Sequence, residues 1–183
     1  MENQAEVWVI MQDAEYDKVW DRVDSLLNFK PSMVNNLPPF MLSIPVNVYD
    51  ISHSNLYKDD ESLKEIMKAI FVNCMANDDF MYALDWQHTC FKYNPRIADN
   101  FEYPVYVKYD EPIKNEHVDS EGYNVYFPTF YPDGDYYFFI AKDFSWGYLT
   151  HPWLKKAWVF GDCLMKEIKN NMLKLGFTLC TAL

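Results

Sequence analysis

Three short segments of the chain contain side chains whose types and spacing could do chemistry. They are Leu84-Asp85-Trp86-Gln87-His88, Pro132-Asp133-Gly134-Asp135 and His151-Pro152-Trp153. Carboxylates can hold a divalent cation or act as general acid and base, histidine can act as a base or metal ligand, and tryptophan can form a recognition surface. We therefore take six residues as candidate binding residues: Asp85, Trp86, His88, Asp135, His151 and Trp153.

The segment around Gly134 also has a purely structural explanation. Proline and aspartate favour a tight turn, and glycine can adopt the positive φ that a hairpin between two aromatic strands needs. Asp133 and Asp135 alone offer too few oxygen ligands for calcium, and no EF-hand spacing follows them. We therefore predict no metal site and no cofactor.

The spacing of Asp85 and His88 argues against a local acid–base pair. On a regular strand, residues three apart face opposite sides of the sheet, so these two share a site only if the strand ends between them. Asp85 and Gln87 face the same side, and either could meet His151 across the sheet.

The His151-Pro152-Trp153 segment is predicted to form a corner, because the residue before a proline is held in extended geometry. His151 could bind or catalyse there, or it could instead cap the loop. Trp153 could be a recognition residue or could fill the core. No motif of a known catalytic class accompanies them, such as Gly-x-Gly-x-x-Gly, a Walker A loop, His-Glu-x-x-His or Gly-x-Ser-x-Gly. We predict no catalytic residues and favour a non-enzymatic function.

Hydrophobic spacing predicts three helices, over residues 13–29, 62–76 and 162–175. The first has Asp13 as its cap, the second begins at a capping box formed by Ser62 and Glu65, and Gly176 closes the third. These helices must position the three segments by packing on a sheet.

Strands are predicted over 40–51, 80–87, 89–93, 105–109, 125–131, 136–142, 146–150 and 157–160. The short spacings indicate an antiparallel meander, and Pro45 places the first strand at an edge or a bulge. Residues 109–122 are polar and acidic and read as an exposed loop. The prediction is one α+β domain over residues 1–183, with a mostly antiparallel sheet backed by about three helices.

Charge is the clearest global property of the chain. There are 16 basic and 27 acidic residues, which gives a net charge of −11. Residues 1–153 hold 11 of the basic and 25 of the acidic residues, a net −14, whereas residues 154–183 carry +3 from 5 basic and 2 acidic residues. Such a field repels phosphate backbones and attracts basic proteins. We expect no unaided nucleic-acid binding and favour a basic protein partner.

Other features of the sequence predict a cytoplasmic protein. The N-terminal residues lack the basic and apolar regions of a secretion signal, and no run approaches the roughly 18 apolar residues that a membrane helix needs. The four cysteines form no Cys-x-x-Cys and read as free thiols in a reducing compartment. We expect no membrane association.

Four short motifs, LDWQH, PDGDYYFF, HPW and VFG, which start at Leu84, Pro132, His151 and Val159, resemble the domain of unknown function 2716 family. The resemblance runs from the first predicted helix to the last. It implies a small, bacterial, cytoplasmic protein and no established catalytic residues. Relatives often place Glu after the HPW-like triplet, where this chain has Leu154, so a mechanism that needs that carboxylate is not expected here.

Two functions from different classes are consistent with these features. The first is a non-enzymatic protein-binding module, such as an inhibitor or immunity protein that masks a basic nuclease or toxin, because the chain is acidic and rich in interface aromatics. The alternative is a protein or enzyme that binds a small molecule or sugar in an aromatic-lined pocket, with His151, Asp135 and Asp85 as polar anchors.

Overall fold

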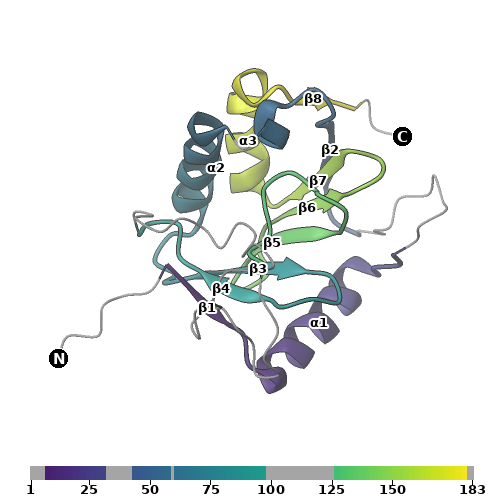
Figure 1. Ribbon diagram of the computed structural model, residues 1–183, viewed down its shortest axis with the longest axis vertical. Coiled ribbons are helices and arrows are strands. Elements are labelled where there is room, and N and C mark those ends of the chain that lie inside the picture. The colour runs from purple at the N-terminus through teal and green to yellow at the C-terminus, as the bar shows by residue number, and fades with distance from the viewer. Residues whose placement is uncertain (1–6, 32–42, 59, 98–125, 181–183) are drawn as a thin grey trace, which may run out of the picture.

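The computed structural model describes residues 7–31, 43–58, 60–97 and 126–180, and within them an antiparallel eight-stranded sheet carries three α-helices (Figure 1). The strand order is β1-β4-β3-β5-β6-β7-β2-β8. The strands are β1 (Trp8–Ile10), β2 (Val46–Asp50), β3 (Met81–Asp85), β4 (Phe91–Tyr93), β5 (Tyr137–Ala141), β6 (Gly147–His151), β7 (Lys156–Phe160) and β8 (Thr178–Leu179). The helices are α1 (Asp13–Leu27), α2 (Glu61–Cys74) and α3 (Asp162–Leu175), with a short 3-10 helix, η1, over Asn55–Lys58. The predicted α+β class is confirmed.

The helices cover both faces of the sheet, with α1 on one side and α2 and α3 together on the other (Figure 1). The α1 side is filled by residues of the helix and of alternate strand positions, including Val19, Val23, Leu27, Leu84, Phe138, Leu149 and Trp158. The opposite side is filled in the same way by residues that include Met67, Phe71, Tyr49, Phe139, Tyr148, Leu164 and Ile168. Because strand side chains alternate between faces, the strands at the centre of the sheet are apolar at successive positions.

The sheet joins strands that are distant in sequence, so the predicted meander is only part of it. β5, β6 and β7 are successive neighbours, with Phe138 opposite Leu149 and Leu149 opposite Trp158. β3 pairs with β5 along its whole length, so that Asp85 lies opposite Tyr137. β2, which Pro45 precedes, pairs with β7 along its length and with the short β8 only at Tyr49 and Asp50.

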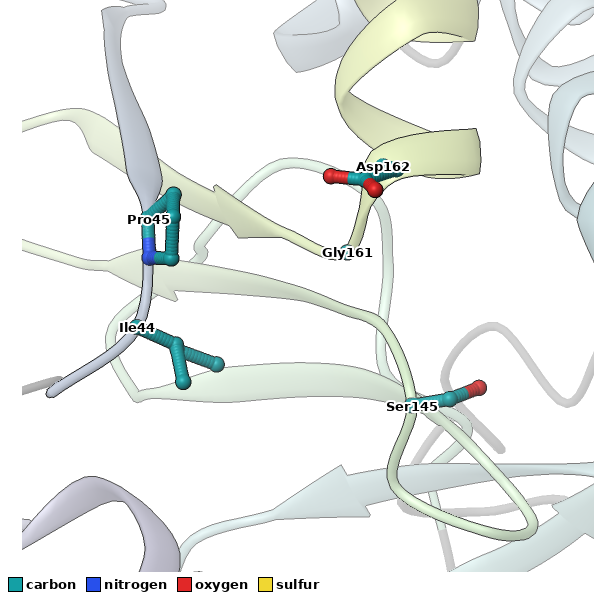
Figure 2. Close-up of a pocket in the computed structure, with 5 residues that line it drawn as sticks. All are labelled: Ile44, Pro45, Ser145, Gly161 and Asp162. Atoms are coloured by element: carbon teal, nitrogen blue, oxygen red, sulfur yellow. The ribbon is translucent and has the colours of Figure 1, made fainter.

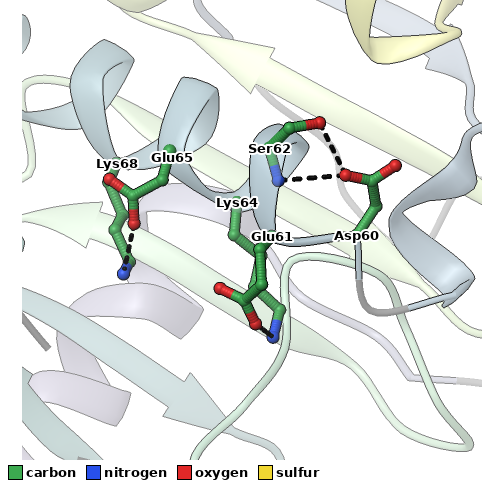
Figure 3. Close-up of polar contacts among 6 residues, drawn as sticks. All are labelled: Asp60, Glu61, Ser62, Lys64, Glu65 and Lys68. Atoms are coloured by element: carbon green, nitrogen blue, oxygen red, sulfur yellow. Dashed lines mark hydrogen bonds and ion pairs between the residues drawn. The ribbon is translucent and has the colours of Figure 1, made fainter. Parts of the chain in front are cut away.

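Two of the predicted helix caps are wrong. The cap of α1 is Gln12, and Asp13 is the first helical residue. At α2, the carboxylate of Asp60 accepts hydrogen bonds from the backbone N–H and the hydroxyl of Ser62, at 3.0 and 2.6 Å, as Figure 3 shows. Asp60 therefore takes the position that the capping box assigns to Ser62, because its side chain reaches the free N–H groups of the first turn. The glycine predicted to close α3, Gly176, does so with φ of 69°.

The strand predictions differ from the structure at one predicted strand that does not form and at two short strands that were missed. Residues 126–131 form no strand, although the prediction covered 125–131, because Pro128 and Pro132 interrupt backbone pairing. β1 and β8 were not predicted. The predicted strand at 105–109, the loop at 109–122 and the start of the strand at 40–51 lie outside the described residues. Among the helices that the structure describes, none has the length and apolar composition needed to cross a membrane.

Candidate functional site

A turn at the end of β3 brings Asp85 and His88 to the same place. β3 ends at Asp85, and the N–H of His88 donates to the carbonyl oxygen of Asp85 at 3.2 Å. Gln87, the third residue of this turn, has φ of 64°, in the left-handed region. The sequence disfavoured an Asp85–His88 pair unless the strand ended between the two residues; the strand does end at Asp85, and the turn carries His88 back beside it.

Asp135 joins these two residues from the segment that leads into β5. The N–H of Trp86 donates to the carbonyl oxygen of Tyr136 at 3.1 Å, which holds the two backbones together. Oδ1 of Asp135 accepts from the N–H of Tyr136 at 2.7 Å, and its Oδ2 lies 3.3 Å from Nε2 of His88. One potential ligand atom from each of Asp85, His88 and Asp135 lies within 4.8 Å of the other two.

Burial raises the pKa of both carboxyl groups of this cluster. Asp85 is only 6% exposed, and its Oδ1 has no hydrogen-bond partner among the described residues. Burial, followed by the charge of Asp135, raises the pKa of Asp85 to about 8. Burial also raises the pKa of Asp135, against the opposing effects of the Tyr136 N–H and His88.

His151 takes a structural position next to this cluster. Its Nδ1 accepts hydrogen bonds from the N–H groups of Trp153 and Leu154, at 3.2 and 3.3 Å, and its Nε2 lies 3.4 Å from the hydroxyl of Tyr136. Burial lowers the pKa of His151 to about 4. The imidazole is therefore neutral at pH 7 and holds the corner after β6 in its conformation.

The two tryptophans among the candidate residues differ in exposure. Trp86 is partly buried and contacts the edges of Phe29 and Tyr136, with ring centroids 6.2 and 5.8 Å away. Trp153 is 49% exposed and lies edge-on to Tyr136 and His151, each with a centroid distance of 5.8 Å. The six candidates thus form two groups, Asp85–His88–Asp135 and His151–Trp153, and Tyr136 and Trp86 lie between them.

A shallow pocket of about 240 Å³ lies elsewhere, at the start of α3 (Figure 2). Its lining consists of Ile44, Pro45, Ser145, Gly161 and Asp162. None of these residues is aromatic or belongs to the six candidates, so this pocket does not correspond to the predicted aromatic-lined site.

Sequence reasoning missed the residues that connect the candidate groups. Tyr136 contacts both groups: its backbone N–H donates to Oδ1 of Asp135, its hydroxyl lies near Nε2 of His151, and its ring packs against Trp153. Cys90 has its sulfur 3.5 and 3.6 Å from the carbonyl oxygens of Asp85 and His88, and its thiol supports the turn. The aromatic run around Tyr136 drew attention to it, but no pattern distinguishes Cys90 from an ordinary buried cysteine. Chemically, two carboxyl groups and an imidazole that meet at one point could hold a cation or a polar ligand.

Comparison with known proteins gives two matches. The family model described as "Protein of unknown function (DUF2716)" matches residues 10–119 and 108–165. The chain is 33% identical over 180 residues to the "Uncharacterized protein YxiI" of Bacillus subtilis (strain 168), which covers 90% of this chain and 93% of that protein. No solved structure matches the chain.

Proposed function

Since the chain belongs to the family of proteins of unknown function DUF2716, which supplies no activity, we propose from its surface that it is a non-enzymatic protein-binding module. Its partner is a basic protein, which it masks as an inhibitor or immunity protein does. The site of action is the cytoplasm, and the free state of Cys74, Cys90, Cys163 and Cys180 is consistent with a reducing compartment.

The observation that carries this proposal is a row of four exposed aspartates along α1. Asp13, Asp17, Asp21 and Asp24 are spaced four, four and three residues apart, so they lie on one face of the helix. Within the part of the chain that the structure describes, no ion pair involves any of the four. This aspartate row therefore presents its charge to solvent.

The aspartate row works against the stability of α1. Like charges three or four residues apart on a helix destabilise it by about 0.2–0.5 kcal/mol per pair. Asp24 lies in the last turn, where the helix dipole disfavours an acid and no basic residue compensates. Burial is the main cause that raises the pKa of Asp24, and repulsion from the charge of Asp21 adds to it. A basic partner would turn this unfavourable arrangement into a favourable one.

The exposed aromatic side chain of Trp153 lies near the end of the same helix. Phe29, which is buried and follows α1, contacts Tyr136 with a centroid distance of 5.2 Å, and Tyr136 in turn contacts Trp153 at 5.8 Å. Tryptophan is enriched at the energetic centres of interfaces. The half-exposed Trp153 is therefore the best anchor for a partner that binds the aspartate row.

The proposal is tested by pull-down from a lysate of the source cell, at low salt and at about 0.5 M salt, where charge–charge attraction is screened. We expect a basic protein, identified by mass spectrometry, that is retained at low salt and weakened at high salt. A variant with Asp13→Asn, Asp17→Asn, Asp21→Asn and Asp24→Asn should lose it.

A matched control removes the same number of charges elsewhere. Glu61→Gln, Glu65→Gln, Asp162→Asn and Glu167→Gln neutralise four acids on α2 and α3, which cover the opposite face of the sheet. This variant should retain the partner. Recovery of no basic protein would contradict the proposal. Equal loss of binding in both variants would also contradict it, since net charge rather than the aspartate row would then be responsible.

The second candidate function is the binding of a small molecule or sugar. One observation favours it: the buried Oδ1 of Asp85 has no partner among the described residues, and a polar ligand could supply the missing hydrogen bond. Screening a sugar and metabolite panel by thermal shift, with Asp85→Asn as control, tests it. If no compound raises the melting temperature of the wild type more than that of Asp85→Asn, the result would count against this function.

A further inference from the structure

The cluster of Asp85, His88 and Asp135 has the composition and arrangement of a three-residue metal site. We propose that these side chains bind a divalent transition-metal ion, and that Zn²⁺ fits best. One ligand atom of each residue lies within 4.8 Å of the other two, and the two that come from different turns, Nε2 of His88 and Oδ2 of Asp135, are 3.3 Å apart. Ligand atoms at 2.0–2.2 Å from a tetrahedral zinc ion lie about 3.4 Å from each other.

An independent observation points to a ligand at this place. Asp85 is 94% buried, and its Oδ1 has no hydrogen-bond partner among the described residues. A buried carboxylate oxygen left without a partner is unfavourable, and proteins normally satisfy such an atom with a donor or a cation. The unsatisfied side chain belongs to the cluster itself, so a metal ion would supply what the fold leaves missing.

The donor set selects the class of ion. One imidazole nitrogen and two carboxylate oxygens suit Zn²⁺ and its first-row neighbours, whereas Ca²⁺ needs six to eight oxygen ligands and Mg²⁺ prefers oxygen and water. No thiolate belongs to the cluster. Three protein ligands leave at least one coordination position for water or another ligand, and the side chain of His88, which is 62% exposed, places this position on the solvent side.

The scaffold holds the two carboxylates and leaves the histidine free to adjust. Asp85 is the last residue of β3, and the hydrogen bond from the Trp86 N–H to the Tyr136 carbonyl fixes the neighbouring backbone of Asp135. His88 follows the turn and is mostly exposed. Rotation of the His88 ring can therefore close the site around an ion without disturbing the sheet.

The inference is independent of the proposed partner and is tested on the full chain, freed of any affinity tag and treated with a chelator. Calorimetric titration with ZnCl₂ should give one ion per chain, and titrations with MgCl₂ and CaCl₂ should give no comparable binding. His88→Gln and Asp135→Asn should each weaken Zn²⁺ binding by at least about tenfold, the smallest effect expected when a residue that supports a metal is removed.

Two control variants separate this site from other donors. His53→Gln removes an exposed imidazole from a different turn, and Cys163→Ser removes an exposed thiol; both should bind Zn²⁺ as the wild type does. The proposal is overturned if the wild type binds no Zn²⁺, if His88→Gln leaves the affinity unchanged, or if either control abolishes binding. Because His88 is exposed, the His88→Gln protein folds and the test keeps its meaning even if Asp135→Asn is unstable.

Discussion

The hydroxyl of Tyr136 lies 3.4 Å from Nε2 of His151, and the two rings pack with centroids 4.9 Å apart. On the other side of the imidazole, two backbone N–H groups point at Nδ1. A ring nitrogen that accepts hydrogen bonds carries no proton, so the proton of the neutral ring resides on Nε2 and is donated towards Tyr136. His151 thus joins β6, the corner after it and the segment before β5.

We predict that His151 makes the protein less stable in mild acid. Burial lowers its folded-state pKa to about 4, below the value of about 6.5 in an unfolded chain. Between these values only the unfolded state takes up a proton, so stability is complete above pH 6.5 and falls as the pH falls towards 4. At about 1.4 kcal/mol per pH unit, the loss between pH 6.5 and pH 5 is about 2 kcal/mol, which urea denaturation at a series of pH values would measure.

The control for this prediction is His151→Asn. Asparagine keeps a side-chain acceptor for the N–H groups of Trp153 and Leu154 but does not titrate. Relative to wild type, the variant should become progressively more stable as the pH falls from 6.5 to 5. Parallel stability curves for the two proteins would show that His151 is not the group responsible.

Replacing the two tryptophans that contact His151 should have very different effects on stability. Trp158 is 5% exposed and lies on the α1 side of the sheet, so Trp158→Ala should cost about 3–5 kcal/mol. Trp153 is 49% exposed, so Trp153→Ala should cost only about 1–2 kcal/mol while weakening partner binding. Chemical denaturation measures both, and equal costs would mean that Trp153 is a core residue after all.

Two glycines with positive φ should respond differently to alanine. A Cβ on Gly134, where φ is 92°, meets no atom within 4 Å, so Gly134→Ala should cost only the conformational strain, about 1–2 kcal/mol. A Cβ on Gly161, where φ is 86°, would lie 2.4 Å from Cβ of Trp146 and 2.6 Å from the carbonyl oxygen of Ser145. Gly161→Ala should cost at least about 3 kcal/mol, because strain and steric overlap add. Thermal or urea unfolding that ranks them the other way would contradict this assignment.

The cap of α2 can be tested by comparing Asp60→Ala with Ser62→Ala. Asp60 accepts two hydrogen bonds at the start of the helix, whereas the hydroxyl of Ser62 only donates one of them. Asp60→Ala should lower the melting temperature more than Ser62→Ala does, because it removes the acceptor for the free N–H group. A larger effect of Ser62→Ala would restore the capping box that the sequence suggests.

The helices and the central strands could be predicted from sequence because their apolar spacing matches the faces they bury. α3 shows this directly, since Leu164, Ile168 and Leu175 are spaced to lie inward and Gly176 ends the helix as predicted. β1 and β8 were missed because three and two residues are too short to show a period. The aromatic residues of 126–131 suggested a strand, but Phe130 packs into the core from a segment without strand pairing.

The meeting of Asp85, His88 and Asp135 could not be predicted, because it depends on where one strand ends. Gln87 adopts a positive φ. Glycine or asparagine at this position would have indicated a turn, but glutamine rarely adopts this conformation and so does not predict one. The contact with Asp135 depends further on the pairing of β3 with β5, two strands far apart in the sequence. Local patterns carry no information about that pairing.

The order of strands in the sheet has a consequence for how the chain folds. β5, β6 and β7 follow one another closely in sequence and form the middle of the sheet, while β3 and β2, which are distant from them in sequence, join them from opposite sides. Closing short loops costs less entropy than closing long ones. In a kinetic φ-value analysis of the folding transition state, we therefore expect high values for substitutions of Phe138 and Leu149 and low values for substitutions in β1 and β8. The chain would then complete the middle of its sheet before either edge is in place.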